Sequence, residues 1–369
     1  MIRVAHLTCV HPRVDTRIFH KMCCSLVDHG VDVKLIIADG MGNQAHTGVD
    51  IIDVGASKNR LDRIINAPAR VFKKAVEVDA DLYHLHDPEL IPIGLKLKNR
   101  GNRVVFDSHE DVPRQILNKP YLSPPVRWSI SYALRLYEAW ACRQLDGVIG
   151  ATPFIRQKFL KINPNTVDIN NFPISSEIGA ERAWDSKKAE VCYVGGISRI
   201  RGIEQMVQAF GQVQNGIRLN LCGSFSEPNL ERACTALPAW GAIIQHGFLN
   251  RAGVRRVMGR SIAGLVTLHP TPNHIDSQPV KMFEYMSAGI PVIASDFPLW
   301  REIVLGNQCG LCVDPMDSVA IANAINYLAQ HPREARQMGE NGLRAVRERY
   351  NWPREENKLL AFYNRILQV

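Results

Sequence analysis

Short apolar runs alternate with longer stretches of helical periodicity along most of the chain. Residues 3–9 and 33–38 are predicted to be buried strands, and residues 18–29 an amphipathic helix between them. The order strand, loop, helix, strand is typical of the start of a doubly wound α/β domain. Ligands in such folds bind beyond the carboxyl ends of the strands, which is where we expect residues 11–17 to lie.

Polar side chains follow two more predicted strands of this first half. One strand leads into His86 and Asp87, and the next, over residues 104–108, leads directly into His109. Because parallel strands end at one edge of a sheet, these groups are expected to face one crevice. Each of them alone is more often a helix cap or a hydrogen-bonded structural histidine than a catalytic group, but two such clusters at successive strand ends favour a site.

The segment 276–302 combines a helix start, a helix stop and several polar groups. Pro279 and Gly289 bound a predicted helix over residues 279–288, and a buried strand follows it. Lys281 lies in the first turn, where a helix ordinarily favours an acid. Free N–H groups and a cation at a helix start favour a bound phosphate. The alternative is an ordinary crossover helix with Glu284 solvated on its face.

A third candidate site begins the second half of the chain, after a polar stretch at residues 161–165 that reads as a linker. The predicted buried strand 190–194 ends in Gly195 and Gly196, and two arginines, Arg199 and Arg201, follow. Glycines let a ligand approach the backbone, and arginine forks fit a diphosphate. Solvated arginines are the alternative.

Composition changes the picture in three respects. A chain of 369 residues with 46% hydrophobic residues predicts two domains. No long apolar run or signal-peptide pattern occurs and the nine cysteines lack a disulfide-type spacing, so we expect a cytoplasmic protein with reduced thiols.

Residues 1–165 hold 23 Lys and Arg against 17 Asp and Glu, a balance of +6 within a total of +8. This excess suits phosphorylated ligands or an anionic membrane, and no motif supports nucleic acid.

The stretch 114–145 interleaves aromatic and basic residues at nearly helical spacing. Trp128, Tyr132, Arg135 and Trp140 are among them, and residues 58–74 predict a second basic helix. A helix of this type can lie at a membrane interface. The alternative places the aromatic side chains in the core and the arginines in solvent.

The segment 276–296 also carries a family resemblance. Asp276, Glu284 and the run Ala-Gly-Ile-Pro-Val-Ile-Ala-Ser-Asp resemble the donor-site signature of retaining GT-B glycosyltransferases of family four, whose members usually have Glu at the first position. The resemblance implies that Glu284 binds the ribose of a nucleotide-sugar. It also implies donor-sugar contacts from Asp276, Ser277 and Gln278.

The other motifs match the family in the expected order along nearly the whole chain. The resemblance implies that His109 lies beside the donor sugar, and that His109, Asp276, Arg199 and Arg201 are catalytic. It assigns the donor diphosphate to Gly195, Gly196, Arg199, Arg201, Val280 and Lys281. It assigns the nucleotide base to Gly223, Phe248 and Leu249. The glycine-rich loop of the family is absent after the first strand, so Asp15, Arg17, His86 and Asp87 become acceptor candidates.

The resemblance predicts two Rossmann-like domains, 1–165 for the acceptor and 166–350 for the nucleotide-sugar, facing a central cleft, with a helix in 351–369 that crosses back to the first domain. It implies retaining transfer of a sugar, from a UDP-sugar by preference, to a carbohydrate or lipid-linked acceptor in surface polysaccharide (lipopolysaccharide or O-antigen) synthesis. Neither a metal nor another cofactor is expected, and the protein would contact the inner face of the membrane peripherally. A GT-B sugar-nucleotide epimerase and a catalytically silent binding module are the alternatives.

Overall fold

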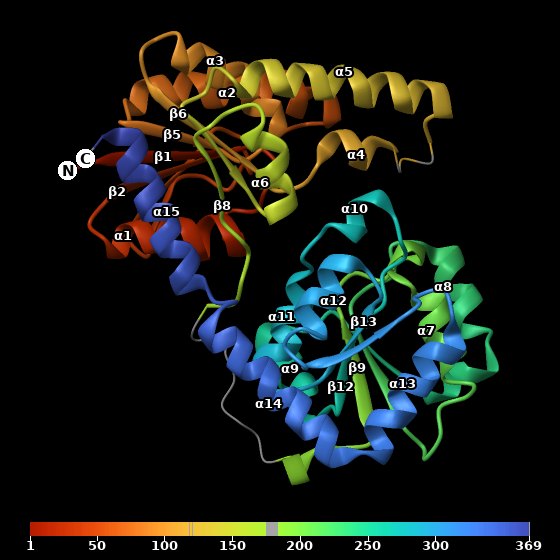
Figure 1. The fold of residues 1–369 in the computed structure, drawn as a ribbon. Helices are drawn as coiled ribbons and strands as arrows, with labels where there is room; N and C mark the ends of the chain where they lie inside the picture. The colour runs from red at the N-terminus through yellow and green to blue at the C-terminus, as the bar shows by residue number, and fades with distance from the viewer. Residues whose placement is uncertain (118, 120, 175–183, 369) are drawn as a thin grey trace. The chain divides into compact units, whose positions relative to one another are not determined.

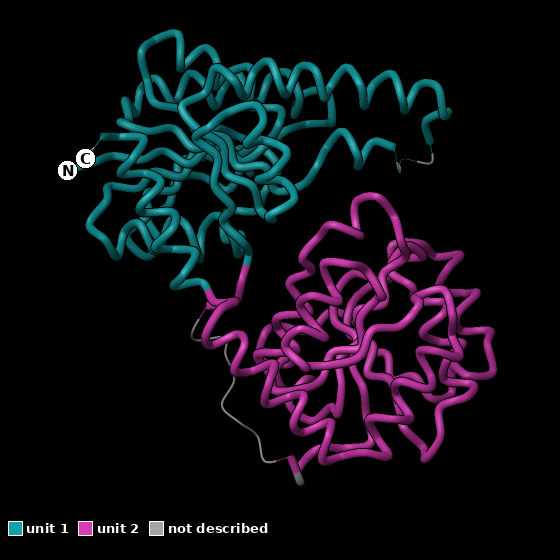
Figure 2. The backbone as a smooth tube through the Cα atoms, in the orientation of Figure 1, with its two compact units in different colours: residues 1–171, 352–369 teal, residues 172–351 magenta. Residues whose placement is uncertain are grey.

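The computed structural model describes residues 1–117, 119, 121–174 and 184–368, which form two compact units (Figure 1). The first unit comprises Met1–Asn171 and Trp352–Val369, and the second comprises Phe172–Asn351 (Figure 2). The sequence boundary after residue 165 thus falls too early. Thr166–Asp168 forms strand β8, which pairs in parallel with the first sheet.

The first unit is built on one sheet with the strand order β3-β4-β2-β1-β5-β6-β7-β8. All neighbouring strands are parallel apart from β3 and β4, which are antiparallel. The strands before β8 are β1 (Arg3–Thr8), β2 (Asp32–Ile37), β3 (Gln44–His46), β4 (Val49–Asp53), β5 (Leu82–Leu85), β6 (Arg103–Ser108) and β7 (Gly147–Gly150).

Helices cover both faces of this sheet. One apolar core cluster joins the strands to α2, α3, α5 and α6, and η1, α1 and α15 pack on the opposite face (Figure 1). The helices are η1 (Thr16–Cys23), α1 (Cys24–Asp28), α2 (Arg60–Val78), η2 (Pro88–Leu90), α3 (Ile91–Lys98), α4 (Val112–Leu117), α5 (Pro124–Cys142), α6 (Pro153–Leu160) and α15 (Trp352–Leu367). The predicted helix 18–29 therefore begins two residues earlier, and its first part, η1, is a π-helix.

The second unit has a parallel sheet with the order β11-β10-β9-β12-β13-β14. Its strands are β9 (Glu190–Val194), β10 (Arg218–Cys222), β11 (Ile243–Gly247), β12 (Ala263–Val266), β13 (Val292–Ser295) and β14 (Gly310–Val313). Two apolar clusters, one on each face of the sheet, make the core.

The helices of the second unit complete the doubly wound arrangement. They are η4 (Trp184–Ser186), η5 (Arg199–Arg201), α7 (Ile203–Ala209), α8 (Pro228–Thr235), η6 (Pro238–Ala242), α9 (Arg251–Arg260), α10 (Pro272–Ile275), α11 (Val280–Ser287), α12 (Pro298–Val304), α13 (Ser318–Gln330) and α14 (Pro332–Glu348). The predicted helix 279–288 corresponds to α11, with Pro279 as its N-cap. Gly289, at φ 64°, ends the helix in the left-handed conformation that glycine adopts readily.

The aromatic stretch in residues 114–145 faces solvent over most of α5. Trp128, Tyr132, Leu136 and Trp140 repeat every fourth residue, and each side chain is more than half exposed. The alternative that places these side chains in the core is therefore wrong. Residues 118 and 120 of this stretch lie outside the described residues.

Within the described ranges, no helix is long and apolar enough to span a membrane. All nine cysteines are free thiols.

Candidate functional site

Two glycine turns meet at the carboxyl ends of β9 and β10 in the second unit. Gly195 follows β9 directly at φ 128°, and its N–H donates to the Cys222 carbonyl at 2.9 Å. A Cβ on Gly223, at φ 147°, would lie 1.9 Å from the Gly195 carbonyl oxygen. Gly223, which the sequence suggested for base contact, is thus also required by backbone packing.

The two predicted phosphate arginines differ in their surroundings. Arg201 reaches the glycine turn, where its Nη1 donates to the Gly196 carbonyl at 2.9 Å. Arg199 instead forms an ion pair with Glu204, and its side chain is 53% exposed. The structure therefore brings only Arg201 to the turn that both arginines were expected to share.

Lys281 points from the first turn of α11 to the same glycine turn. Its Nζ lies over the ring of Tyr193, 4.0 Å from the centroid, and a Cβ on Gly195 would come within 3.2 Å of it. The Nζ is buried and has no hydrogen-bond partner among the described residues. Burial, helped by the positive charge of Arg201, lowers the pKa of Lys281 to about 7. An anion bound here would accept hydrogen bonds from this amine and favour its charged form.

The remaining donor-site candidates border the start of α11. Ser277 lies in a turn in which its hydroxyl donates to the His274 carbonyl at 2.9 Å, and Trp300 Nε1 donates to the Ser277 carbonyl at 2.7 Å. Gln278 Oε1 is buried and has no partner among the residues that the structure describes. Glu284 follows Lys281 by three residues, so both side chains lie on one side of α11.

Asp276, Val280 and the two base candidates complete the predicted set. Asp276 caps the end of α10, and Val280 is the first residue of α11. Phe248 is 86% exposed in the loop after β11, and Leu249 packs on the edge of the core. An exposed ring at this position is available to stack on a planar ligand.

In the first unit, Asp107 organises the crevice at the end of β6. It is fully buried, and Arg17 Nε and Nη2 donate to its two carboxylate oxygens at 2.9 and 2.7 Å. Arg17 Nη1 also donates to the Ile169 carbonyl at 2.7 Å. Burial alone would raise the pKa of Asp107, but the charge of Arg17 holds it well below its usual range. Arg17, an acceptor candidate, is therefore committed to a buried ion pair.

A chain of histidines extends from this carboxylate. His86 Nε2 lies 2.8 Å from His6 Nδ1, and His86 Nδ1 lies 3.3 Å from His109 Nε2. His109 Nε2 is also 3.0 Å from Asp107 Oδ2, and its side chain is 18% exposed. Burial lowers the pKa of His86 to about 4, which makes it neutral at pH 7. His109 is thus the partly exposed end of a buried polar network.

The other two acceptor candidates stabilise the loop after β1. Asp15 accepts from the N–H groups of Arg17 and Ile18 at 2.8 and 2.9 Å, which is the helix-cap alternative considered from the sequence. Asp87 is buried and accepts from Thr8 Oγ1 at 2.9 Å and from Cys9 N–H at 2.5 Å. Both carboxylates are therefore engaged by the protein itself.

Sequence reasoning missed Asp107, His6 and His84. Only the sheet brings these residues together with His86, and His84 Nδ1 lies 2.5 Å from the hydroxyl of Tyr363 on α15. Two triads, His6–His84–His86 and His86–Asp107–His109, have donor atoms within 4.8 Å of one another, a spacing that could hold a metal ion. Hydrogen bonds within the network already use several of these atoms, and the absence of a metal stays a prediction.

Two family models match successive halves of the chain. The family "Glycosyltransferase Family 4" matches residues 16–170, and the family "Glycosyl transferases group 1" matches residues 175–345. The two matched regions correspond closely to the two structural units.

Curated relatives match at low identity. An alpha-maltose-1-phosphate synthase from Mycolicibacterium smegmatis is 26% identical over 195 residues, which are 51% of this chain and 50% of the relative. The lipopolysaccharide core biosynthesis mannosyltransferase LpcC from Rhizobium leguminosarum is 30% identical over 102 residues, which are 28% of this chain and 29% of the relative. The matched part of this chain thus spans about half the length of the first relative and less than a third of the second.

Solved structures match over the full length. Sucrose-phosphate synthase from Thermosynechococcus elongatus has a TM-score of 0.79 at 18% identity and covers 100% of both chains. Anabaena HepE in complex with UDP-glucose has a TM-score of 0.73 at 16% identity, with coverage of 99% and 100%. The predicted fold is thereby confirmed, and the chain has the GT-B fold of the group 1 and family 4 glycosyltransferases.

Proposed function

We propose that the protein transfers a sugar from a nucleotide-sugar to a carbohydrate or lipid-linked acceptor. The observation that carries this proposal is the buried Lys281 amine, which has no partner among the described residues and lies with Arg201 against the Gly195–Gly196 turn. A buried amine without a partner is costly to a folded protein, whereas a diphosphate would make it favourable. A site of this kind fits a ligand with two phosphates.

The same cations suit the chemistry of transfer. When the sugar leaves, negative charge develops on the departing nucleoside diphosphate. Arg201 and Lys281 are fixed in place before the reaction, so they stabilise this charge with little reorganisation. The scheme requires no metal ion. Arg199 is less suited than the sequence suggested, because Glu204 already neutralises it.

The rest of the donor is assigned along α11. Glu284 is proposed for the ribose hydroxyls, and Asp276, Ser277 and Gln278 are proposed for the sugar. The buried Gln278 Oε1, which lacks a partner in the described part of the chain, supports a polar ligand at this end of the helix. A UDP-sugar is preferred, and the HepE complex with UDP-glucose supports this preference by analogy of fold.

We assign retention of configuration by a displacement on one face of the sugar, in which the leaving phosphate helps to deprotonate the acceptor. His109 is the candidate reacting-site residue of the first unit, because it is the partly exposed end of the network held by Asp107. The other acceptor candidates are used structurally, so their role becomes one of positioning.

The cellular setting is proposed to be surface polysaccharide synthesis at the inner face of the membrane. The relative LpcC, named for lipopolysaccharide core synthesis, supports this setting. The exposed row of aromatic and apolar side chains on α5 supports peripheral contact with lipid. The match to an alpha-maltose-1-phosphate synthase supports a soluble carbohydrate as the alternative acceptor.

Incubation with a panel of nucleotide-sugars, with and without acceptors, tests the proposal. Transfer predicts that nucleotide is released rapidly only when an acceptor is present, with an α-linked product from an α-linked donor. Formation of an epimer without acceptor would indicate the epimerase alternative. Tight binding without turnover of any donor would indicate a silent binding module.

A further inference from the structure

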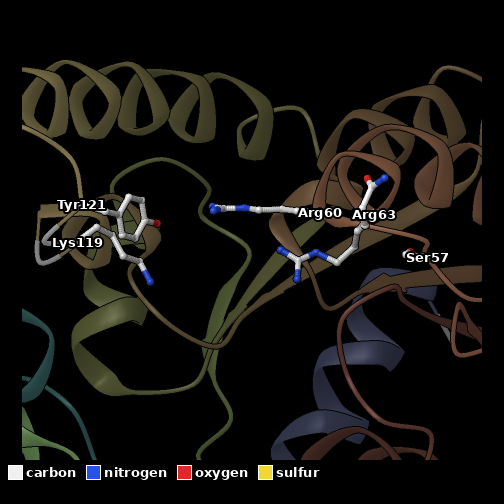
Figure 3. Close-up of a pocket in the computed structure, with 6 residues that line it drawn as sticks. Ser57, Arg60, Arg63, Lys119 and Tyr121 are labelled. Atoms are coloured by element: carbon white, nitrogen blue, oxygen red, sulfur yellow. The ribbon is translucent and has the colours of Figure 1, made fainter. Parts of the chain in front are cut away.

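The first unit holds a basic cavity of about 520 Å³ that lies between the start of α2 and two residues from between α4 and α5, Lys119 and Tyr121. Its lining residues are Ser57, Asn59, Arg60, Arg63, Lys119 and Tyr121. Figure 3 shows Arg60 and Arg63 reaching into this space from the α2 side, with Lys119 and Tyr121 on the opposite side. None of these residues belongs to the donor site described above.

The lining contains three cations and no acid. Arg63 forms an ion pair with Glu89, whose Oε1 lies 3.5 Å from the Arg63 Nη2, so part of its charge is offset. Arg60 and Lys119 form no ion pair among the described residues, and they keep the lining positive. The nearby acid of α2, Asp62, accepts from Lys58 N–H and Asn66 Nδ2, and so is engaged elsewhere. The cavity therefore has a net positive lining.

Two buried polar atoms in the cavity lack a partner. Ser57 Oγ and Arg63 Nε are both buried without a hydrogen bond to any described residue. Buried donors are ordinarily satisfied by protein, water or ligand. Arg63 in addition presents the planar fork that binds phosphate through two parallel hydrogen bonds. These features distinguish the cavity from a scatter of solvated surface charge.

An apolar rim adjoins these cations. Leu61, Ile64 and Ile65, on the first turns of α2, are 69%, 42% and 64% exposed. Ile64 lies one turn beyond Arg60 on the same side of the helix. A phosphate attached to a lipid would thus meet both a cationic cavity and exposed apolar side chains.

We propose that this cavity binds the phosphate or diphosphate group of a phosphorylated ligand. The identification of this ligand as the sugar acceptor rests on the proposed glycosyltransferase function. The phosphate can belong to a lipid-linked acceptor or to a soluble phosphorylated sugar, and both share the chemistry that Arg60, Arg63 and Lys119 recognise.

Calorimetric titration with inorganic diphosphate tests the cavity directly. The Arg201→Ala variant serves as the background, because it weakens the donor site. We expect one remaining binding event there, weakened at least tenfold by Arg60→Ser with Arg63→Ser. The matched control, Arg100→Ser with Lys161→Ser, removes two exposed cations of the same unit and should leave the binding unchanged.

Three results would overturn the proposal: no diphosphate binding in the background variant, binding that survives the cavity substitutions, or an equal loss in the charge-matched control. Melting temperatures of all the variants are measured alongside, so that a loss of binding is scored only in folded protein. If the Arg60 and Arg63 double variant unfolds, Ser57→Ala and Lys119→Ser replace it.

Geranyl diphosphate separates the two sources of phosphate. Binding at least tenfold tighter than that of inorganic diphosphate, and reduced by Ile64→Ser with Ile65→Ser, would indicate a lipid-linked ligand. Equal affinities would indicate a soluble one. If wild type turns over no nucleotide-sugar while the cavity still binds diphosphate, the transferase proposal fails and the cavity stands. If turnover is normal but the cavity substitutions change no binding, the cavity proposal fails alone.

Discussion

The amine of Lys281 lies 4.0 Å from the centre of the Tyr193 ring, and it is buried without a hydrogen-bond partner among the described residues. The ring face provides some attraction for a cation. It does not replace the hydrogen bonds that an ammonium group loses when it leaves water. We infer that this amine lowers the free energy of unfolding of the ligand-free protein and that a bound ligand stabilises it.

Replacement of Lys281 by Met tests this interpretation. Met keeps much of the side-chain length and removes the buried amine, so the free energy of unfolding of the ligand-free protein should rise by about 1–3 kcal/mol. The same variant should lose most of its thermal stabilisation by UDP. Denaturant unfolding and thermal shifts provide the two readouts. A variant that is less stable than wild type yet still stabilised by UDP would contradict our interpretation.

Nucleotide binding should also be coupled to proton uptake. Because the pKa of Lys281 is lowered to about 7, the amine is mostly neutral at pH 8. A bound diphosphate favours the charged form and raises this pKa, so a proton is taken up on binding. Affinity should therefore fall as the pH rises from 7 to 9. Titration calorimetry in buffers of different ionisation enthalpy measures the uptake, which Lys281→Met should abolish. Zero uptake in wild type at pH 8 would refute the predicted coupling.

The sequence was most informative where local chemistry decides the structure. Pro279 and Gly289 bound α11 because proline suits a helix start and glycine suits the left-handed residue after a helix. Gly195 and Gly196 marked a turn for a similar reason. These signals depend on neighbouring residues only, so one sequence is enough to read them.

The first-unit network was less predictable because it depends on distant pairing. Arg17 and Asp107 are 90 residues apart, and a basic residue after a strand looks the same whether it awaits a ligand or meets a buried carboxylate. His6 likewise reads as part of an ordinary strand until β1 is placed beside β5. The boundary near residue 165 failed similarly, since β8 is too short to be recognised without its partner β7.

The ion pair of Arg17 and Asp107 should be essential for folding of the first unit. Arg17→Met leaves a buried carboxylate without its cation, and we expect a loss of about 3–5 kcal/mol in the free energy of unfolding. The double variant Arg17→Met with Asp107→Asn removes both charges and should recover part of that loss. Urea unfolding of wild type, the single variant and the double variant measures the free energy of unfolding of each. A single variant as stable as wild type would mean that the pair is not essential.

Contact with membranes is expected to have two components. Arg135 and Arg143 should each add about 1 kcal/mol on anionic lipid, and Trp128 and Trp140 should add apolar contact that salt does not screen. Arg127 is left intact, because its Nη1 donates to the Leu117 carbonyl and joins α5 to α4. Replacement of the two arginines by Ser should remove the salt-sensitive part of binding.

Vesicle sedimentation at low and high salt measures both components. Trp128→Ser with Trp140→Ser should remove the binding that survives high salt. Leu305→Ser, at a 41% exposed apolar position of the second unit, is the matched control. Equal pelleting with neutral and anionic vesicles, or none with either, would rule out this mode of association.

The central claim is that the turn at Gly195, with Arg201, Lys281 and Glu284, binds the diphosphate and ribose of a nucleotide-sugar, and calorimetric titration of UDP tests it most directly. Arg201→Ala and Glu284→Gln should each weaken the binding of UDP by about 1.5–3 kcal/mol, which is roughly tenfold to a hundredfold in affinity, because each removes charge-assisted hydrogen bonds. Arg218→Ala, at the amino end of β10 and exposed, should leave the affinity unchanged. If wild type binds UDP and both site variants bind it equally well, the nucleotide site is not where we place it.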